Sequence, residues 1–254
     1  MPGICDFCQL TSIIPDLSVE GNVEKWRRLE NAKQRVLYML DTLGLPFREV
    51  ENSTTPPLRF EFKSDGEQPV PTGHDKGCIV INIKEADSVI RELSRVQLGE
   101  PQRTLVGHFR HELGHFFWDR VVKSNNSSLH EFRRLFGDER KSDYVQALGN
   151  YYQNGPVGDW QPSFVSAYST MHPWEDFAET FATYIDMCSV LDTANHFATA
   201  KVGFDDLDGM VKSYSHVGVM ANELNRDMGL LDLVPEVFTP PVVEKLRFVH
   251  VLCY

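Results

Sequence analysis

A short motif of two histidines and a glutamate is the part of the sequence best suited to chemistry. His111, Glu112 and His115 form the pattern HExxH within the run HFRHELGHFFWD. Residues four apart on an α-helix lie one turn apart on the same side, so both imidazoles can bind one Zn²⁺ ion. Glu112 would then lie beside the open coordination position and take a proton from a zinc-activated water. The motif predicts a zinc hydrolase with one catalytic ion and Glu112 as general base.

The surrounding residues favour a use for this motif over a chance match on a solvated helix. His108, His111, Glu112 and His115 occupy positions i, i+3, i+4 and i+7, a single ionisable stripe on a helix whose other faces are apolar. Burying four ionisable groups is costly unless they are paired or bind a metal. We expect His108 to support the site by contacting a ligand or a nearby loop, and not to bind the ion.

A later stretch, MHPWEDFAETFATY, offers the third protein ligand that a catalytic zinc with two histidines needs. Glu175 and Glu179 are four apart and share one helical face, and their spacing does not decide which of them binds the ion. Glu175 comes two residues after Pro173 in the first turn, so we predict it as the ligand. Glu179 lies one turn deeper and is predicted to hydrogen-bond a ligating imidazole. The alternative is an ordinary helix start, since the helix dipole favours acidic residues there.

The helices that must position these residues are visible as apolar residues at helical spacing. Pro101 suits the first turn of the HExxH helix, which is expected to run to about Val122, and Pro173 opens a helix that runs at least to Asp186. A capping-box pattern of Ser128 with Glu131 predicts a further helix start. Other helices are expected over Asn22 to Leu43, from Ser128 to a stop at Gly137, over Tyr144 to Tyr152, and from Pro240 through Val251.

Two short alternating segments predict the strands of a small sheet. The apolar positions are Leu58, Phe60 and Phe62 in the first segment, and Ile79, Ile81 and Ile83 in the second. The fold class is therefore α+β, mostly helical, with a small sheet beside the HExxH helix. At 254 residues and 42% hydrophobic composition, the chain is expected to form one catalytic domain over residues 1–254.

Composition limits the compartment and the partners. No run of roughly 18 apolar residues and no signal-peptide pattern is present, and the five cysteines lack the regular spacing of a disulfide framework, so we expect a cytoplasmic protein. The formal charge of −11 is spread along the chain, and no run of Lys or Arg would follow a phosphate backbone or an anionic membrane. We expect neither nucleic acid nor a membrane as a partner.

The chain resembles the bacterial zinc-binding metallopeptidases, a zincin-like family that usually carries an N-terminal zinc ribbon. The resemblance covers nearly the whole chain and rests on the segments CDFCQLTSIIPDLS, RTLVGHFRHELGHFFWDR, FGDERKSDY and VSAYSTMHPWEDFAETFATYI. It implies the zincin fold and zinc-dependent hydrolysis, while the substrates of the family are poorly defined. An edge strand over residues 77–83 could pair with an extended peptide, as zincins commonly allow.

The EDFAE run is similar to that of gluzincins in which the first glutamate binds zinc, which favours Glu175 again. In such enzymes a tyrosine seven residues earlier assists the transition state, and the matching position here is Tyr168. A phenol there could donate a hydrogen bond to the oxyanion formed during attack on a carbonyl. A packed tyrosine in a loop is the alternative, and His172 could also take the oxyanion role.

Cys5 and Cys8 have the spacing of a zinc knuckle, but no second CxxC follows. Residues 1–18 are a candidate remnant of a zinc ribbon, the alternative being that the ribbon has been lost, and we predict no second zinc. The other three cysteines, Cys78, Cys188 and Cys253, lie in apolar sequence and are expected in the core.

The function predicted from these patterns is a gluzincin-like zinc metallopeptidase that cleaves a peptide or protein substrate. One rival is a zinc-dependent amidase or isopeptidase that acts on a non-peptide or modified-protein substrate. A second is a zinc-bearing binding module without turnover, against which Glu112 argues, because a structural zinc site needs no carboxylate beside an open position. The bond specificity and the oligomeric state do not follow from the sequence.

Overall fold

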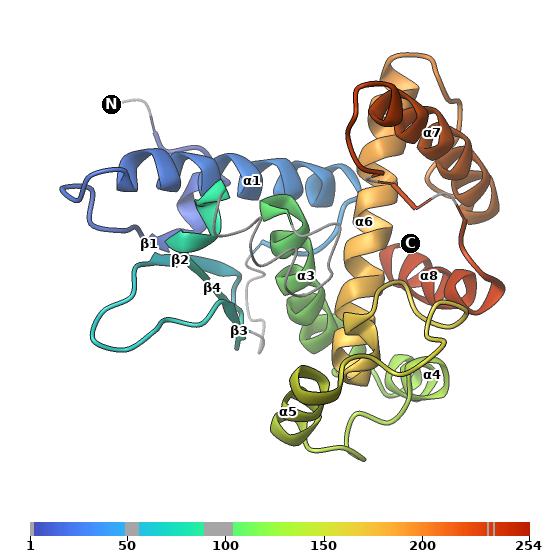
Figure 1. Cartoon of the computed structure of the whole chain (residues 1–254), viewed down its shortest axis with the longest axis horizontal. Coiled ribbons are helices and arrows are strands. Elements are labelled where there is room, and N and C mark those ends of the chain that lie inside the picture. Colours follow the sequence, from blue (N-terminus) through green and yellow to red (C-terminus); the bar gives the residue numbers. More distant parts are fainter. Residues whose placement is uncertain (1–2, 49–55, 89–103, 233, 236) are drawn as a thin grey trace. The chain divides into compact units, whose positions relative to one another are not determined.

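The computed structural model describes residues 3–48, 56–88, 104–232, 234–235 and 237–254 (Figure 1). The chain forms two compact units, Met1–Arg120 and Val121–Tyr254, and each is described by itself. The single catalytic domain expected from the sequence stays a prediction.

The first unit contains a four-stranded mixed sheet in the order β1-β2-β4-β3. The strands are β1 Thr11–Ile13, β2 Arg59–Lys63, β3 Gly73–Asp75 and β4 Cys78–Asn82. β1 and β4 both pair with β2 in parallel, and β3 is antiparallel to β4. The two predicted strands are confirmed as β2 and β4, except that Leu58 lies just before β2 and Ile83 begins the short 3-10 helix η2 Ile83–Ala86.

The prediction that residues 77–83 form an edge strand is wrong. β4 is paired on both sides, since Ile79 is opposite Phe60 of β2 and opposite His74 of β3. β3 turns back onto β4 through Lys76 and Gly77, whose φ angles of 44° and 82° are those of a two-residue hairpin turn. The edge strands of this sheet are therefore β1 and β3, and each is only three residues long.

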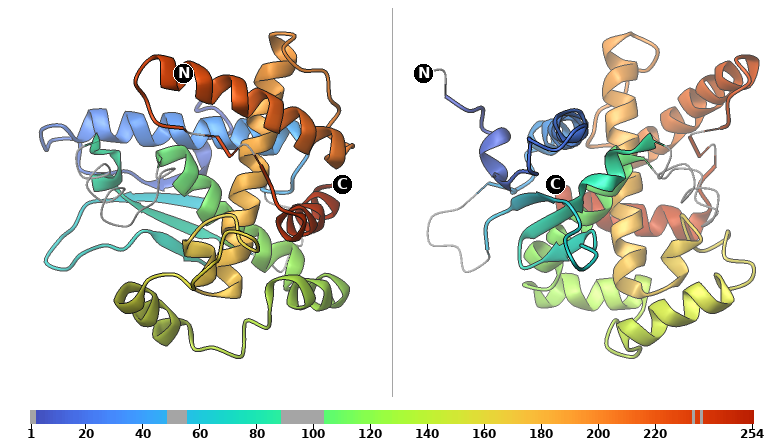
Figure 2. Two further views of the ribbon diagram at one scale, coloured as in Figure 1. Left: turned by 45° about the vertical axis from the view of Figure 1, so that its right-hand side comes forward. Right: turned by 60° about the vertical axis from the view of Figure 1, so that its left-hand side comes forward.

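Two helices, α1 Asn22–Thr42 and α3 Leu105–Phe117, cover the face of the sheet on which β2 buries its aromatic rings (Figure 2). Phe109 of α3 packs its ring 5.8 Å from that of Phe60 and 6.1 Å from that of Phe62. Lys33 of α1 places its ammonium group 5.5 Å and 5.9 Å from the centres of the same two rings. The prediction of a small sheet beside the HExxH helix is thereby confirmed.

The HExxH helix begins at a cap that the sequence analysis did not identify. Thr104 is the N-cap of α3, and its hydroxyl accepts a hydrogen bond from the Gly107 amide at 2.9 Å. Pro101, expected in the first turn, lies outside the described residues. After Phe117 the chain continues as a π-helical turn, Trp118–Val122, in which hydrogen bonds join residues five apart instead of four. The chain is therefore helical as far as Val122, the end predicted from the sequence.

The second unit is helical and centres on α6 (Figures 1 and 2). Its helices are α4 Asn126–Phe136, α5 Tyr144–Asn154, α6 Pro173–His196, α7 Leu207–Asp227 and α8 Pro240–Cys253. Helices α4, α7 and α8 pack against α6. Near its start, the Phe177 ring of α6 contacts Phe136 of α4 at 5.7 Å and Phe248 of α8 at 6.3 Å. Further along, Asp186 accepts a hydrogen bond from the Tyr214 hydroxyl of α7 at 2.7 Å.

Most helix positions in this unit match the prediction, but one cap does not. The capping box of Ser128 with Glu131 is wrong, because α4 begins two residues earlier, at Asn126. The side chain of Asn125 accepts hydrogen bonds from the amides of Ser127 and Ser128 at 2.9 Å and 3.1 Å. Asn125, three residues before Ser128, already accepts hydrogen bonds from the free amides at the helix start. Ser128 therefore lies inside the first turn of α4 and is not its cap. Gly137 follows the last residue of α4 as predicted.

The observed class is α+β and mostly helical, as the sequence predicts. Across the described ranges, no helix has both the length and the apolar character that crossing a membrane requires.

Candidate metal centre

Helix α3 brings two imidazoles together. The Nε2 atoms of His111 and His115 are 3.1 Å apart, and the rings stand nearly perpendicular with centroids 4.7 Å apart. Two nitrogen ligands of a tetrahedral zinc, each bonded at about 2.0–2.1 Å, would lie about 3.3 Å apart. His115 is buried and His111 half-buried, while Phe109 and Leu113 anchor the other side of the helix in the core. The pair therefore has the spacing that one shared ion requires.

Helix α6 carries Glu175 in its first turn. The His172 side chain caps this helix by accepting a hydrogen bond from the Trp174 amide, and Pro173 occupies the first position. Glu175 is only 1% exposed, and its Oε1 accepts a hydrogen bond from the Tyr144 hydroxyl at 2.9 Å. A buried carboxylate is stabilised in its ionised form by such a donor and by the helix dipole.

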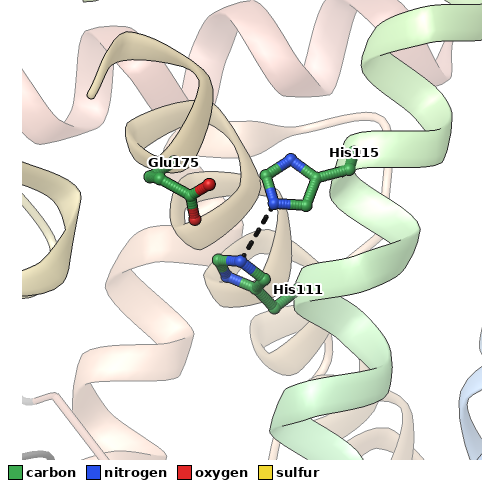
Figure 3. A group of neighbouring side chains, drawn as sticks. All are labelled: His111, His115 and Glu175. Atoms are coloured by element: carbon green, nitrogen blue, oxygen red, sulfur yellow. Dashed lines mark hydrogen bonds between the residues drawn. The ribbon is translucent and has the colours of Figure 1, made fainter. Parts of the chain in front are cut away.

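The candidate ligand atoms of His111, His115 and Glu175 all lie within 4.8 Å of one another. Figure 3 shows the three side chains, His111 and His115 from α3 and Glu175 from α6. Two imidazoles and one carboxylate are the donor set of a His₂Glu catalytic zinc site. The residues present thus fit the ion that the sequence analysis predicts.

Glu112, which follows His111 in the sequence, is buried. Its side chain is 6% exposed, and within the described part of the chain its Oε2 is buried without a hydrogen-bond partner. A buried carboxylate oxygen left in this way is costly in free energy unless a water, an ion or a substrate group satisfies it. That environment is compatible with the general base predicted from the sequence.

Tyr168 begins the 3-10 helix η4 Tyr168–Thr170, and its ring packs edge-on against Tyr151 at 5.4 Å. Burial raises the pKa of the Tyr168 phenol well above its usual value, and the negative charge of Glu175 raises it further. A phenol with its ordinary pKa of about 10 is already protonated at neutral pH, and the raised pKa extends that state to higher pH. This is the state that the predicted oxyanion role needs, and the role itself stays a prediction.

Two residues predicted to support the ligands have defined contacts of their own. Glu179 Oε2 accepts a hydrogen bond from the Ser166 hydroxyl at 2.7 Å. His108 Nδ1 lies 3.3 Å from Glu85 Oε2, on the 3-10 helix η2. These contacts fix where the two side chains lie, and the predicted support that each gives to a ligand remains a prediction.

His172, the alternative oxyanion donor, uses both ring nitrogens in the fold. Nδ1 accepts from the Trp174 amide at 3.1 Å, and Nε2 pairs with the Glu139 carbonyl oxygen at 3.1 Å. Because a carbonyl oxygen can only accept, the proton is on Nε2. His172 therefore holds the start of α6, which leaves Tyr168 as the better candidate for the oxyanion.

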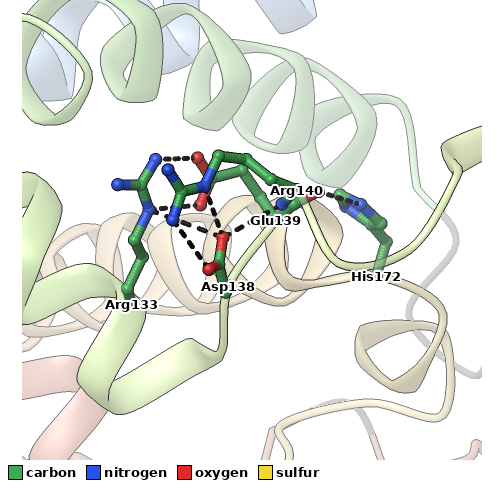
Figure 4. A network of polar contacts seen from close by, with 5 residues as sticks. All are labelled: Arg133, Asp138, Glu139, Arg140 and His172. Carbon is green, nitrogen blue, oxygen red and sulfur yellow. Dashed lines mark hydrogen bonds and ion pairs between the residues drawn. The ribbon is translucent and has the colours of Figure 1, made fainter.

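The segment that holds His172 is itself held by ion pairs (Figure 4). Arg133 of α4 binds the Glu139 carboxylate through two hydrogen bonds of 2.9 Å and 2.5 Å, and it lies 3.7 Å from Asp138. Arg140 in turn binds Asp138 through two hydrogen bonds of 2.8 Å. Arg133 keeps the pKa of Glu139 below its usual value, so the pair stays charged at neutral pH. We call these five residues the α6 brace: Arg133, Asp138, Glu139, Arg140 and His172.

Tyr144 is the residue of this region that the sequence analysis missed. The sequence pattern marks Tyr144 only as the start of a helix, although it is the last residue of the segment FGDERKSDY, on which the family resemblance rests in part. Asp143 caps α5, because its side chain accepts a hydrogen bond from the Gln146 amide at 2.9 Å. This cap places Tyr144 at the first position of α5, from which its hydroxyl contacts Glu175. Helical spacing cannot reveal a contact between residues 31 positions apart.

The CxxC pair lies outside the group of three candidate ligands. Cys5 Sγ and Cys8 Sγ are 3.0 Å apart, and Gln34 donates a hydrogen bond to Cys8 Sγ at 3.2 Å. Cys188 is fully buried, as expected for a core cysteine, and Cys78 and Cys253 are partly buried.

Comparison with known proteins agrees with this picture. The model of a family described as "Putative zinc-binding metallo-peptidase" matches residues 22–252. Three uncharacterized proteins, one from Mycobacterium bovis and two from strains of Mycobacterium tuberculosis, are each 39% identical over 257 residues, which covers 98% of this chain and 75% of the relative. No solved structure matches the chain.

Proposed function

Since the chain belongs to the zinc-binding metallo-peptidase family, we propose that it is a gluzincin-like peptidase with one catalytic zinc held by His111, His115 and Glu175. One observation carries the proposal: the three candidate ligand atoms, from a motif and a glutamate 60 or more positions later, lie within 4.8 Å of one another. Burying such ionisable groups close together costs free energy unless they are paired or bind a metal.

The chemistry follows from the chain's own groups. When bound, zinc supplies a Lewis acid that polarises the scissile carbonyl and lowers the pKa of a bound water to about 7. Glu112, one residue from His111 on α3, accepts the proton of the attacking water and passes it to the leaving nitrogen. Tyr168, at the start of η4, donates a hydrogen bond from its phenol to the developing oxyanion.

The substrate we propose is a peptide or a protein, as the membership in a peptidase family supports. The formal charge of −11 without a run of Lys or Arg argues against nucleic acid as a partner. The irregular set of five cysteines supports a cytoplasmic location.

The test separates metal binding from chemistry. Purified protein should hold about one zinc per chain by elemental analysis, and His111→Ala should lose most of it. The control is His130→Ala, which removes an exposed histidine of α4 and should keep the metal. Glu112→Gln should keep the metal and lower the rate of peptide cleavage at least about a hundredfold, the usual scale for a general base.

Two results would overturn the proposal. Zinc retained at full content by both His111→Ala and His115→Ala would remove the metal site. Unchanged cleavage by Glu112→Gln would mean that another group activates the water.

A further inference from the structure

The start of α5 and the start of α6 are joined through one tyrosine. Tyr144, the first residue of α5, donates its hydroxyl proton to Glu175 Oε1 at 2.9 Å. The acceptor is a carboxylate that is 1% exposed, so little water can replace this donor. A hydrogen bond to a buried charge is among the stronger ones in a protein.

The Tyr144 ring is fixed by two other rings from the start of α6. It packs edge-on against His172 at 5.4 Å and against Trp174 at 5.8 Å, with interplanar angles of 72° and 77°. His172 is in turn held by the Glu139 carbonyl, at the end of the α6 brace. These contacts orient the Tyr144 ring so that its hydroxyl is directed at Glu175.

A carboxylate can turn about its last bond and can bind an ion through one oxygen or both. With Oε1 engaged by the Tyr144 hydroxyl, the plane of the Glu175 carboxylate is set before any ion arrives. Groups that orient ligands in this way typically change metal affinity by 10- to 100-fold.

We infer that Tyr144 is a positioning residue for the proposed zinc ligand Glu175, whose carboxylate it holds in one rotation for the metal. The inference rests on the proposed function. This role differs from that of a residue that only links α5 to α6. Loss of such a link would change the stability of the fold, but it would not change the geometry of the metal ligands.

The test uses the full chain and measures metal binding without turnover. Tyr144→Phe keeps the ring and removes the hydroxyl, so Zn²⁺ affinity in competition with a chelator should fall by 10- to 100-fold. The visible absorption bands of the Co²⁺-loaded protein should also shift, because they report the ligand geometry. Tyr152→Phe is the matched control, since this residue lies on the same helix with a largely exposed side chain, and it should change neither readout.

A second comparison shows whether Tyr144 acts through Glu175. Glu175→Ala alone should lose most of the Zn²⁺ affinity, and adding Tyr144→Phe to it should cause no further loss. If Tyr144→Phe lowers the Zn²⁺ affinity equally in wild type and in Glu175→Ala, then Tyr144 acts only by stabilising the fold, and the inference is overturned.

Failure of the inference is distinguishable from failure of the proposed site. Wild-type protein that binds no Zn²⁺, or Glu175→Ala that binds it as tightly as wild type, would overturn the site and the inference with it. If Glu175→Ala loses the metal while Tyr144→Phe keeps both the affinity and the Co²⁺ spectrum, the site stands and the inference alone is wrong.

Discussion

His111 and His115 stand on a helix held by apolar packing, whereas Glu175 stands on a helix whose start is held by hydrogen bonds and ion pairs. Under α3, Phe109 is fully buried against the rings of β2. At the start of α6, His172 and Tyr144 provide polar contacts, and Arg133 anchors the loop that holds His172. Apolar packing sets where a helix lies, while directional hydrogen bonds set where one carboxylate points. The two regions should therefore fail differently when they are mutated.

The largest effect is expected from the apolar side of this comparison. Phe109→Ala removes a fully buried ring between α3 and the sheet, so the free energy of unfolding should fall by about 3–5 kcal/mol. Chemical denaturation with a constant m-value would measure it. A loss below about 1 kcal/mol would show that apolar packing does not hold the histidine helix.

A smaller effect, on metal affinity, is expected from Glu179. If this carboxylate orients a ligating imidazole, Glu179→Ala should weaken Zn²⁺ binding by about 10- to 100-fold and leave one ion per chain. The competition assay used for Tyr144 would measure it, with Glu131→Ala, a partly exposed glutamate of α4, as control. A loss of metal as complete as that of Glu175→Ala would exchange the roles of the two glutamates.

The smallest effect is expected from the cap of α6. His172→Ala removes the side-chain acceptor for the Trp174 amide, and a lost N-cap destabilises a helix start by about 0.5–2 kcal/mol. His172→Asn supplies another capping acceptor and should recover part of this stability. Equal stability of wild type and both variants by thermal unfolding would mean that the His172 cap does not stabilise the start of α6.

The same difference explains what could be predicted from the sequence. The HExxH helix and the α6 start are local patterns, and Pro173, Glu175 and the apolar spacing around them indicate both helices without tertiary information. The resemblance to the metallopeptidase family is confirmed by the family match. Tyr144 was missed because its contact joins residues far apart in the chain.

Other misses have equally physical causes. β1 and β3 have three residues each, too few to show an alternating pattern, and α7 was not singled out as a helix. The pairing of β4 on both sides depends on the hairpin turn at Gly77, where an added Cβ would lie 2.8 Å from the Pro57 carbonyl oxygen. Only the folded backbone reveals that close approach.

The order of strands in the sheet also affects how the first unit can fold. The β3–β4 hairpin closes through a two-residue turn, so it needs little chain entropy to form. β1 instead pairs with β2 in parallel, and Ser12 and Phe60 in that pairing are 48 positions apart, with all of α1 between them. During synthesis β1 has no partner strand until residues near 63 have left the ribosome. We therefore expect the hairpin and α1 to form early, and β1 to join the sheet as one of its last, slowest pairings.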